Sequence, residues 1–452
     1  MSNILLKNIH CLATMNQQKE KLSGIDLLIQ NRQIRNINKN LVDKEAEIID
    51  CSTKLVIPGL VNSHHHLFQT LTRNVPVVQN EKLFNWLTTL YDIWKNVDDE
   101  AIYYSTQIGC GELLKTGCTT TTDHHYLYPR HLQADIPAIQ FEAAGKLGIR
   151  FCPTRGSMSR SQKDGGLPPD IVVQNEETIL KHCEDSIQKF HDPSPLSMRQ
   201  LHLGPCAPFN VSAELMRDTA LLARKYGVRL HTHLAETKDE ENYCGEVYGK
   251  RPLQLMEELN WLGEDVWFAH GVHFTNEELQ CLAETKTGVA HCPASNMRLG
   301  SGIARVPEML KLSIPVGLAV DGSASNDASD LVGEMRTALL LHRVNGGADA
   351  ITAEQVLEMA TVGSAKLLGR SDIGSLEIGK AADVAIFELN KIEYTGSLSD
   401  PLAALIFSGY NHEAFMTIVN GEIVVREGRM VKVEEEEIIR HGNRISYELL
   451  KK

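Results

Sequence analysis

The most constraining feature of this sequence is a repeated alternation of short apolar segments with longer segments of helical periodicity. Eight candidate strands can be counted in the middle of the chain, and each ends near polar residues. They span residues 55–66, 118–125, 150–156, 198–205, 229–236, 267–273, 288–293 and 315–321. Helical periodicity appears between them, for example over 101–116, 213–226 and 276–285. Eight β–α units of this kind predict a (β/α)8 barrel.

A doubly wound sheet of similar length is the alternative, and the position of the reactive residues argues against it. They stand at the carboxyl ends of several strands far apart in the sequence, as barrel chemistry requires. We therefore predict an α/β protein with a TIM-like barrel over residues 58–371. Residues 1–57 and 372–452 contain short β-rich runs, including a strong hairpin signal at Asn420-Gly421. They predict a small β-sandwich domain built from both chain termini, with an exposed terminal helix over 434–452.

Composition narrows the class of protein. With 45 basic and 58 acidic residues, the net charge of −13 argues against a nucleic-acid partner, which needs a basic face. No uninterrupted apolar stretch reaches the roughly 18 residues of a membrane span, so no membrane partner is expected. The ten cysteines are scattered without a CxxC pair, which predicts reduced thiols in a cytoplasmic protein. This is the profile of an enzyme acting on small molecules.

Two pairs of histidines carry the strongest chemical signal. The run HHH closes the first barrel strand, and because side chains alternate along a strand, its outer members His64 and His66 share one face. A second pair, His231 and His233, ends another strand, and Glu236 follows three residues after His233. An imidazole that holds a metal and a carboxylate that moves a proton can serve one metal-bound water in this relation.

Two further strand ends complete the pattern. His270 ends the apolar run after Trp267, and Asp321 stands at the tip of the run 316–320, where a buried carboxylate needs a partner. The order His-x-His, His, His, Asp on four strand ends resembles the amidohydrolase superfamily. The segments PGLVNSHHH, HTHLAET, AHCPASNMRLGSG, VDGSASND and GSLEIGKAADVAIF resemble it too. Within the superfamily the chain is similar to the single-metal aminohydrolases, which include guanine deaminase, S-adenosylhomocysteine deaminase and the triazine hydrolases.

The resemblance implies a role for each of these residues. The implied metal ligands are His64, His66, His233 and Asp321. The implied catalytic residues are Glu236 as the proton shuttle, His270 as the group that polarises the water or the tetrahedral intermediate, and Asp321, which orients the water. His231 is the rival ligand, but only His233 stands three residues before the acid. No bridging lysine ends the fourth strand, which favours one divalent ion per chain, Zn²⁺ first, with Fe²⁺ and Mn²⁺ as alternatives.

Four residues are candidates for substrate binding: Gln69, Trp86, Arg155 and Cys206. Gln69 completes an HxHxxQ pattern, and its amide suits a lactam edge, although a solvent-facing loop residue fits equally well. Trp86 has the helical spacing of a core residue, and in the resembling enzymes this segment closes over the pocket. Arg155 could bond a carbonyl or form a surface salt bridge. Cys206 replaces the arginine of guanine deaminases and the histidine of S-adenosylhomocysteine deaminases, or it is a buried inert thiol.

These observations predict a hydrolytic deaminase of an amino-substituted N-heterocycle. The resemblance favours 8-oxoguanine, which with water would give urate and ammonia. A pterin, a triazine or S-adenosylhomocysteine would need the same metal machinery and differ only in the pocket. A non-catalytic homologue would have lost a ligand or the acid, and all six residues are present here. Barrel helices often pair, so a homo-oligomer is compatible with the sequence.

Overall fold

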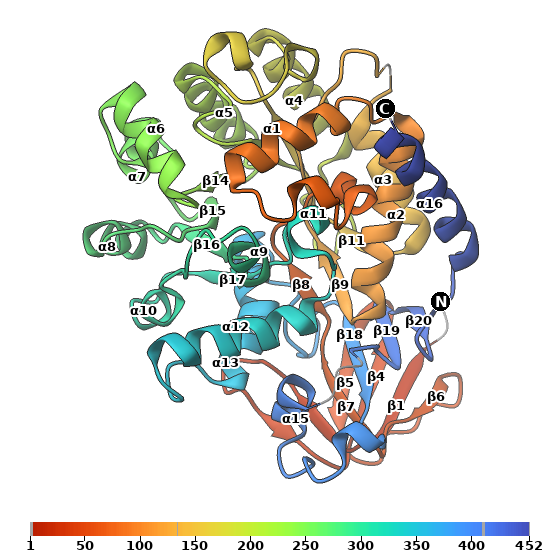
Figure 1. The fold of residues 1–452 in the computed structure, drawn as a ribbon. Coiled ribbons are helices and arrows are strands. Elements are labelled where there is room, and N and C mark those ends of the chain that lie inside the picture. Colours follow the sequence, from red (N-terminus) through yellow and green to blue (C-terminus); the bar gives the residue numbers. More distant parts are fainter. Residues whose placement is uncertain (1–2, 133, 409–411, 452) are drawn as a thin grey trace.

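The computed structural model describes residues 3–132, 134–408 and 412–451 and places a ring of parallel strands at the centre of the larger part of the chain (Figure 1). Two parallel sheets form it, in the orders β11-β9-β8 and β10-β12-β13-β14-β15-β16-β17. Ser63 N donates to Leu318 O at 3.3 Å, which joins the first strand to the last. The strands are β8 (Leu60–Asn62), β9 (Cys118–Thr121), β10 (His124–His125), β11 (Arg150–Phe151), β12 (Thr154–Ser157), β13 (His202–Pro205), β14 (Leu230–Leu234), β15 (Val266–His270), β16 (Gly288–His291) and β17 (Val316–Leu318). The α/β, TIM-like barrel class predicted from the sequence is confirmed.

Helices cover the outside of these strands (Figure 1). The predicted helices over 213–226 and 276–285 are α5 and α8, and the one predicted over 101–116 is α2, which begins earlier because the Asp98 side chain accepts from Ala101 N. The barrel-side helices are α1 (Leu83–Trp94), α2 (Asp99–Lys115), α3 (Ile136–Leu147), α4 (Glu176–Phe190), α5 (Ala213–Tyr226), α6 (Lys238–Tyr248), α7 (Pro252–Glu258), α8 (Asn276–Thr285), α9 (Pro293–Arg298), α10 (Val306–Lys311), α11 (Ser323–Asn326), α12 (Leu331–Gly346), α13 (Ala353–Glu358), the π-helical η5 (Met359–Gly363) and α14 (Ser364–Leu367). Short 3-10 turns are η1 (Leu67–Thr72), η2 (Pro76–Val78), η3 (Gln162–Asp164), η4 (Asp170–Val172) and η6 (Ile392–Tyr394).

The first predicted strand, over 55–66, is divided between two parts of the molecule. Its beginning lies in β7 (Lys54–Pro58), which belongs to another sheet, and β8 starts the barrel immediately afterwards. The chain crosses at Gly59, whose N–H donates to Asp383 O. A Cβ on Gly59 would lie 2.2 Å from Thr119 Oγ1, so only glycine fits this crossing.

Two sheets built from both chain ends pack against each other below the barrel (Figure 1). Their strand orders are β5-β4-β1-β6 and β21-β20-β19-β18-β7-β2-β3. One apolar cluster joins them, with Leu6 and Leu27 from the first and Val56, Val384 and Ile418 from the second. Their remaining elements are β1 (Ile4–Ile9), β2 (Cys11–Ala13), β3 (Lys21–Leu22), β4 (Ile25–Gln30), β5 (Gln33–Asn38), β6 (Glu47–Asp50), β18 (Val384–Glu388), α15 (Pro401–Phe407), β19 (Met416–Val419), β20 (Glu422–Arg426) and β21 (Arg429–Met430).

The hairpin signal at Asn420-Gly421 is confirmed, since Val419 pairs with Glu422 across that turn. The domain boundaries at 57/58 and 371/372 stay a prediction.

The terminal helix that the sequence predicts is present, but it is exposed on one side only. In α16 (Glu435–Lys451) one face packs on α2 and buries Ile438, Ile445 and Leu449. Apolar residues recur there at intervals of three and four, which places them on one stripe.

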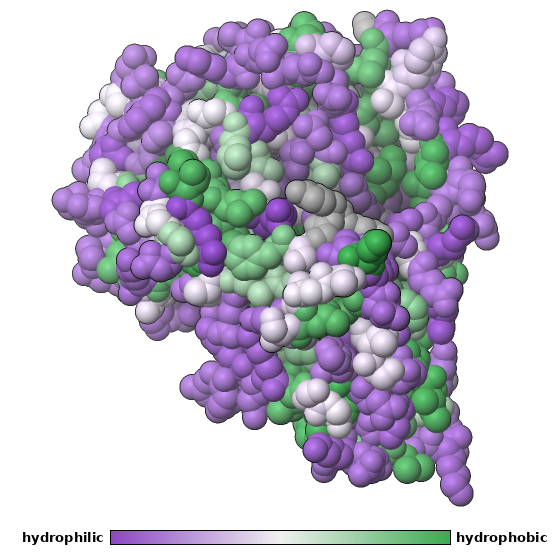
Figure 2. Space-filling view, turned by 60° about the horizontal axis from the view of Figure 1, so that its bottom comes forward, coloured by the Kyte–Doolittle hydropathy of each residue, from purple (hydrophilic) through white to green (hydrophobic). Residues whose placement is uncertain are grey.

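Hydrophilic residues dominate the face of the molecule seen in Figure 2, and hydrophobic ones show through in separate places. Most large apolar side chains are instead buried in the clusters of the barrel and the sandwich. Within the described ranges, no helix has both the length and the apolar character that a membrane span requires.

Candidate active site

Four predicted metal ligands converge at the carboxyl ends of the barrel strands. His64 and His66 follow β8, His233 lies in β14, and Asp321 follows β17. Asp321 Oδ1 lies 3.2 Å from His64 Nε2 and 3.3 Å from His66 Nε2. His66 Nε2 lies 3.0 Å from His233 Nε2. All four residues are buried. The fold therefore brings together, around one point, four side chains that are far apart along the chain.

The donor set fits a divalent ion such as Zn²⁺. Tetrahedral coordination with Zn–N and Zn–O distances near 2.0 Å puts neighbouring ligand atoms about 3.3 Å apart. The three distances of 3.0–3.3 Å between the ligand atoms agree with this spacing. His64 Nε2 is buried and lies against the Asp321 carboxylate. A metal ion held between these two groups would satisfy both of them.

The other ring nitrogens of the histidines are held by neighbours. His64 Nδ1 lies 2.7 Å from His231 Nε2, and the Nδ1 of His231 lies 2.9 Å from Trp267 O. His231 therefore stands behind His64 instead of facing the same point as His233. His66 Nδ1 bonds His124 O at 2.8 Å. Contacts of this kind fix the orientation and tautomer of a metal-binding imidazole.

Glu236 and His270 lie beside the ligand cluster. Glu236 Oε2 is 3.5 Å from His270 Nε2, which is also 3.9 Å from Asp321 Oδ2. His270 Nδ1 bonds Asn296 Oδ1 at 2.9 Å, so the amide sets the direction of the ring. Ser301 Oγ reaches Glu236 Oε1 at 3.5 Å. The arrangement places a carboxyl group and an imidazole on one side of the cluster.

The ionisation of these two groups is shifted by their surroundings. Burial raises the pKa of the Glu236 carboxyl, and this outweighs the opposing effect of His270. Burial alone would lower the pKa of His270, but the carboxylates of Glu236 and Asp321 raise it overall. A carboxyl group with a raised pKa next to an imidazole is suited to proton transfer near neutral pH.

A small cavity lies directly above the cluster. It encloses about 30 Å³, far below the roughly 300–1,000 Å³ of open small-molecule sites. Helix α1 covers it, with Trp86 and Tyr91 among the lining side chains. The full lining is His66, Gln69, Leu83, Trp86, Leu87, Tyr91, Tyr126, Cys206, Phe209, Asn210, His233, Glu236, His270, Leu299, Asp321 and Ser325. Helix α1 thus forms one wall of the cavity above the cluster.

Three of the four predicted substrate-binding residues line this cavity. Gln69 is buried, and its Oε1 has no hydrogen-bond partner among the described residues. Trp86 lines the cavity and also packs in an apolar cluster, so both interpretations of its spacing hold. Cys206 receives a hydrogen bond from Asn210 Nδ2 at 3.4 Å. Burial raises the pKa of its thiol to about 12, which keeps the thiol neutral.

Arg155 is not brought into the cavity, and the prediction that it binds substrate there is corrected. Its guanidinium donates to Gln174 Oε1 at 2.7 Å, His182 Nδ1 at 3.0 Å and Gly156 O at 2.5 Å. It also lies over the ring of Tyr128 at 4.0 Å. These contacts hold Arg155 against α4 and the loop before it. The salt-bridge alternative is not what the structure shows either, because no carboxylate is among these partners.

Sequence reasoning missed several residues of the site. Asn210 and Tyr91 lie together at one side of the cavity, with Asn210 Nδ2 donating to Tyr91 Oη at 3.2 Å. His124 has ring nitrogens close to those of the metal cluster, since ligand atoms of His64, His66, His124 and His233 all lie within 4.8 Å of one another. Asn296 orients His270 from within the AHCPASNMRLGSG segment, which is the one signal that could have indicated it.

The fold and the site define the class of protein, and comparison with known proteins agrees. Residues 55–424 match the model of the Amidohydrolase family, and the chain belongs to this family. An 8-oxoguanine deaminase of Pseudomonas aeruginosa is 49% identical over 361 residues, which cover 80% of each chain. A hydroxydechloroatrazine ethylaminohydrolase of Pseudomonas sp. strain ADP is 35% identical over 97% of this chain and 94% of its own.

The solved structures lead to the same family. The crystal structure of an atrazine chlorohydrolase from Arthrobacter aurescens TC1 complexed with zinc has a TM-score of 0.94 and 33% identity, covering 98% of this chain and 100% of that one. The chain is therefore a hydrolase that acts on C–N bonds, with relatives that are deaminases and aminohydrolases. The zinc-complexed neighbour and the histidine cluster support a divalent metal ion at the site.

Proposed function

We propose that this chain is a metal-dependent deaminase that converts 8-oxoguanine and water to urate and ammonia. The observation that carries the proposal is the position of His270, 3.5 Å from Glu236 and 3.9 Å from Asp321, below a cavity whose polar wall includes Gln69 and Cys206. The identity of 49% to an 8-oxoguanine deaminase supports the choice of substrate.

His64, His66, His233 and Asp321 would hold the divalent ion, with zinc as the first candidate. When bound, such an ion acts as a Lewis acid that lowers the pKa of a water molecule to about 7. Asp321 and His270 face that position and would orient the attacking water. Asn296 keeps the His270 ring directed at it.

Glu236 would carry the protons. Its carboxylate takes a proton from the water as the oxygen attacks the ring carbon that bears the 2-amino group, and it passes this proton to the adjacent ring nitrogen. The second proton of the water then goes through Glu236 to the amino group, which leaves as ammonia while the carbonyl of urate forms. The amino group is a poor leaving group until it is protonated, so one mobile carboxyl serves each step.

The pocket suits an oxidised purine. The unpartnered Gln69 amide oxygen can accept from a ring N–H, and its NH₂ can donate to a carbonyl. The neutral Cys206 thiol is a weak donor, which tolerates a protonated ring nitrogen where an arginine would favour an unprotonated one. Trp86 and Phe209 line the cavity and can cover the flat faces of a ring.

An ammonia-release assay of the purified protein tests the substrate. The panel is 8-oxoguanine, guanine, isocytosine, isoxanthopterin, S-adenosylhomocysteine and hydroxyatrazine. We expect kcat/KM for 8-oxoguanine to exceed that for guanine at least about tenfold, since unmatched buried polar groups penalise the poorer substrate. Reaction of a pterin or triazine without 8-oxoguanine would overturn the substrate but not the chemistry. Ammonia from none of them, with metal bound, would overturn the deaminase itself.

Elemental analysis tests the metal site separately. We expect about one divalent ion per chain, because one set of four ligands is present and no bridging lysine accompanies it. The double variant His64→Ala/His66→Ala should lose the ion, while substitution of the half-buried His441 in α16, His441→Ala, should keep it. Two equivalents per chain, or full retention by the double variant, would contradict the assignment.

A further inference from the structure

A second cavity lies at the opposite end of the barrel from the candidate active site. It has a volume of about 560 Å³, within the range of small-molecule sites. Arg229 directly precedes β14, Pro315 precedes β17, and Lys366 lies in α14. The cavity is thus formed at the amino ends of the strands whose carboxyl ends carry His233 and Asp321. We call it the basal cavity.

The lining of the basal cavity is strongly basic, in a chain whose net charge is −13. Its charged residues are Arg229, Lys286, Lys366, Arg370, Lys380 and Glu264. Three of the cations have carboxylate partners, because Lys286 pairs with Glu264, Arg370 with Asp372 and Lys380 with Glu377. Arg229 and Lys366 have no carboxylate partner within 4 Å among the described residues.

Arg229 is fixed in place by uncharged groups. Its Nε donates to Leu367 O at 2.7 Å, and Nη2 donates to Glu264 O. Gly369 closes over it with a φ of +70°, and a Cβ there would lie 2.9 Å from Arg229 Cδ. Backbone carbonyls orient a guanidinium but do not neutralise it. A partly desolvated cation held in this way favours a nearby anion.

Arg370 brings a further positive charge to the wall of the cavity. It is only 5% exposed, and its Nε and Nη2 both donate to Asp372 at 2.8 Å. Nη2 also donates to Ser197 O at 3.1 Å, and the guanidinium interacts with the buried Cys152 thiol. Arg370 is therefore largely paired within the protein, and the unmatched charge of the cavity comes from Arg229 and Lys366.

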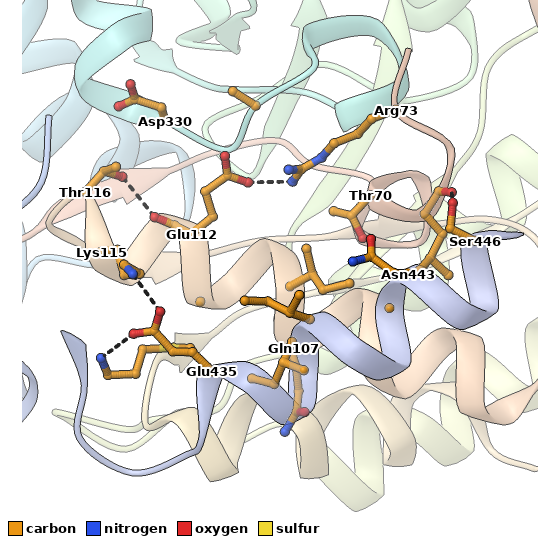
Figure 3. Close-up of a pocket in the computed structure, with 18 of the residues that line it drawn as sticks. Thr70, Arg73, Gln107, Glu112, Lys115, Thr116, Asp330, Glu435, Asn443 and Ser446 are labelled. Atoms are coloured by element: carbon orange, nitrogen blue, oxygen red, sulfur yellow. Dashed lines mark hydrogen bonds and ion pairs between the residues drawn. The ribbon is translucent and has the colours of Figure 1, made fainter. Parts of the chain in front are cut away.

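Volume alone does not distinguish this cavity, as a larger one shows. That cavity of about 710 Å³ lies between α2 and α16 (Figure 3). Its cations are matched, since Arg73 pairs with Glu112 and Lys115 pairs with Glu435, as the dashed lines in Figure 3 show. The basal cavity differs because part of its positive charge is unmatched.

We propose that the basal cavity binds a small organic phosphate. Unmatched basic groups suit a phosphate, which arginine and lysine bind through charged hydrogen bonds. The apolar side chains of Pro315, Val362, Leu367 and Ile373 line the same space and would contact the organic part of the ligand. This site is separate from the candidate active site, and the proposal does not depend on the proposed deaminase activity.

Isothermal titration calorimetry of the zinc-loaded full-length protein tests the proposal, with phenyl phosphate and inorganic phosphate as probes. We expect phenyl phosphate to bind with a Kd below about 1 mM and more tightly than inorganic phosphate, because it also covers the apolar wall. Lys366→Glu should weaken binding at least about tenfold, since it replaces attraction by repulsion. Lys366→Arg keeps the charge and should stay within about threefold of wild type.

Lys44→Glu is the matched control, because Lys44 is exposed in the turn before β6 and the change in net charge is the same. It should leave the Kd within about twofold of wild type. Melting temperatures of the variants check that each is folded, and Lys366→Gln replaces Lys366→Glu if the latter is not. No binding of either probe up to about 5 mM, or equal weakening by Lys366→Glu and Lys44→Glu, would overturn the proposal.

Discussion

The two ends of the barrel differ in how completely their buried polar groups are paired. At the carboxyl ends of the strands, buried imidazoles and carboxylates crowd together, and Gln69 Oε1 has no hydrogen-bond partner among the described residues. The residues there also have unusual backbone, with φ of +73° at His270 and +62° at Asp321. At the amino ends, where the barrel meets the sandwich, Arg150 is almost fully satisfied. Its guanidinium bonds both oxygens of Asp383, at 3.0 and 3.1 Å, and backbone carbonyls nearby.

The difference indicates where this fold carries a local energetic cost. Non-glycine residues in the left-handed region and buried polar atoms without partners each destabilise a fold, and they gather at functional sites. A buried, fully bonded ion pair fixes two segments together, and removal of one partner leaves the other charge buried and uncompensated. Substitutions at the carboxyl ends should therefore change catalysis with little loss of stability, and those at the Arg150–Asp383 pair should do the reverse.

The largest expected effect is that of Glu236→Gln. The amide keeps the shape of the side chain but cannot carry a proton, so kcat should fall by about 10²–10⁴-fold or more. Metal content should stay the same, and the melting temperature should not fall, because a buried ionisable group is replaced by a neutral one. Glu214→Gln in α5, which is exposed, serves as the control. A variant that keeps a tenth of wild-type activity would assign the proton transfers to another residue.

Asp383→Ala tests the other end of the barrel. Removing it leaves the Arg150 guanidinium buried without its charge partner and frees the N–H of Asn420, which donates to Asp383 at 2.7 Å. The free energy of unfolding should fall by about 3–5 kcal/mol, measured by urea denaturation. Asp185→Ala breaks the exposed pair with Lys181 and should cost less than about 1 kcal/mol. The kcat of the folded fraction should be retained, and a catalytic loss as large as that of Glu236→Gln would remove the contrast between the two ends.

Cys206→Arg tests substrate specificity in the candidate active site. We expect it to narrow the preference for 8-oxoguanine over guanine from its wild-type value of at least about tenfold, because arginine donates strongly to an unprotonated ring nitrogen and a thiol does not. Steady-state kcat/KM values on the two bases measure the change. Cys206→Ser, of similar size and also neutral, is the control and should keep the preference. An unchanged ratio in the arginine variant would show that Cys206 does not face the imidazole ring of the substrate.

The smallest expected effect is on the pH dependence of folding stability, and it comes from Asp123. The Asp123 carboxyl group accepts hydrogen bonds from Leu67 N at 2.7 Å and Gln140 Nε2 at 2.6 Å. Burial raises the pKa of this carboxyl to about 7, above the roughly 3.9 of an unfolded aspartate. The folded state therefore binds the proton more tightly. The stability that this group contributes is fully present below about pH 4 and is lost as the pH rises through 7.

Asp123→Asn should remove that part of the pH dependence, since Gln140 can turn its amide to match. Urea unfolding at pH 5 and pH 8, at fixed zinc concentration, should show wild type losing stability relative to the variant at the higher pH. Parallel behaviour of the two proteins would mean that Asp123 is ionised at both values.

Much of the site could be predicted because its groups lie at strand ends with short, fixed spacings. The alternation of His64 and His66 and the three-residue step from His233 to Glu236 are local properties of the chain. Arg155 was placed wrongly because both faces of a barrel strand are covered, so the sequence does not say which face its side chain takes. Asn210 and Tyr91 come from a loop and from α1, and no local pattern marks them.

The fold likewise could be predicted where the signal is local in the sequence, but not where it depends on contacts between distant residues. The eight strands were visible as apolar runs, but the change of sheet at Gly59 depends on the close approach of Thr119, which is distant in sequence. The apolar stripe of α16 was present in the sequence, but the surface on α2 that buries it could not be identified before the fold was known.

The order of the strands in the sandwich affects how the chain can fold during translation. Strand β7 lies between β2 and β18, and β18 is made more than three hundred residues after it. Through most of translation the β7 edge that later faces β18 has no neighbour and is open to pairing with another chain. Contacts of such long sequence separation also form slowly. A nascent chain that stalls before residue 384 therefore exposes the apolar segment Lys54–Pro58 and becomes a natural target for chaperones.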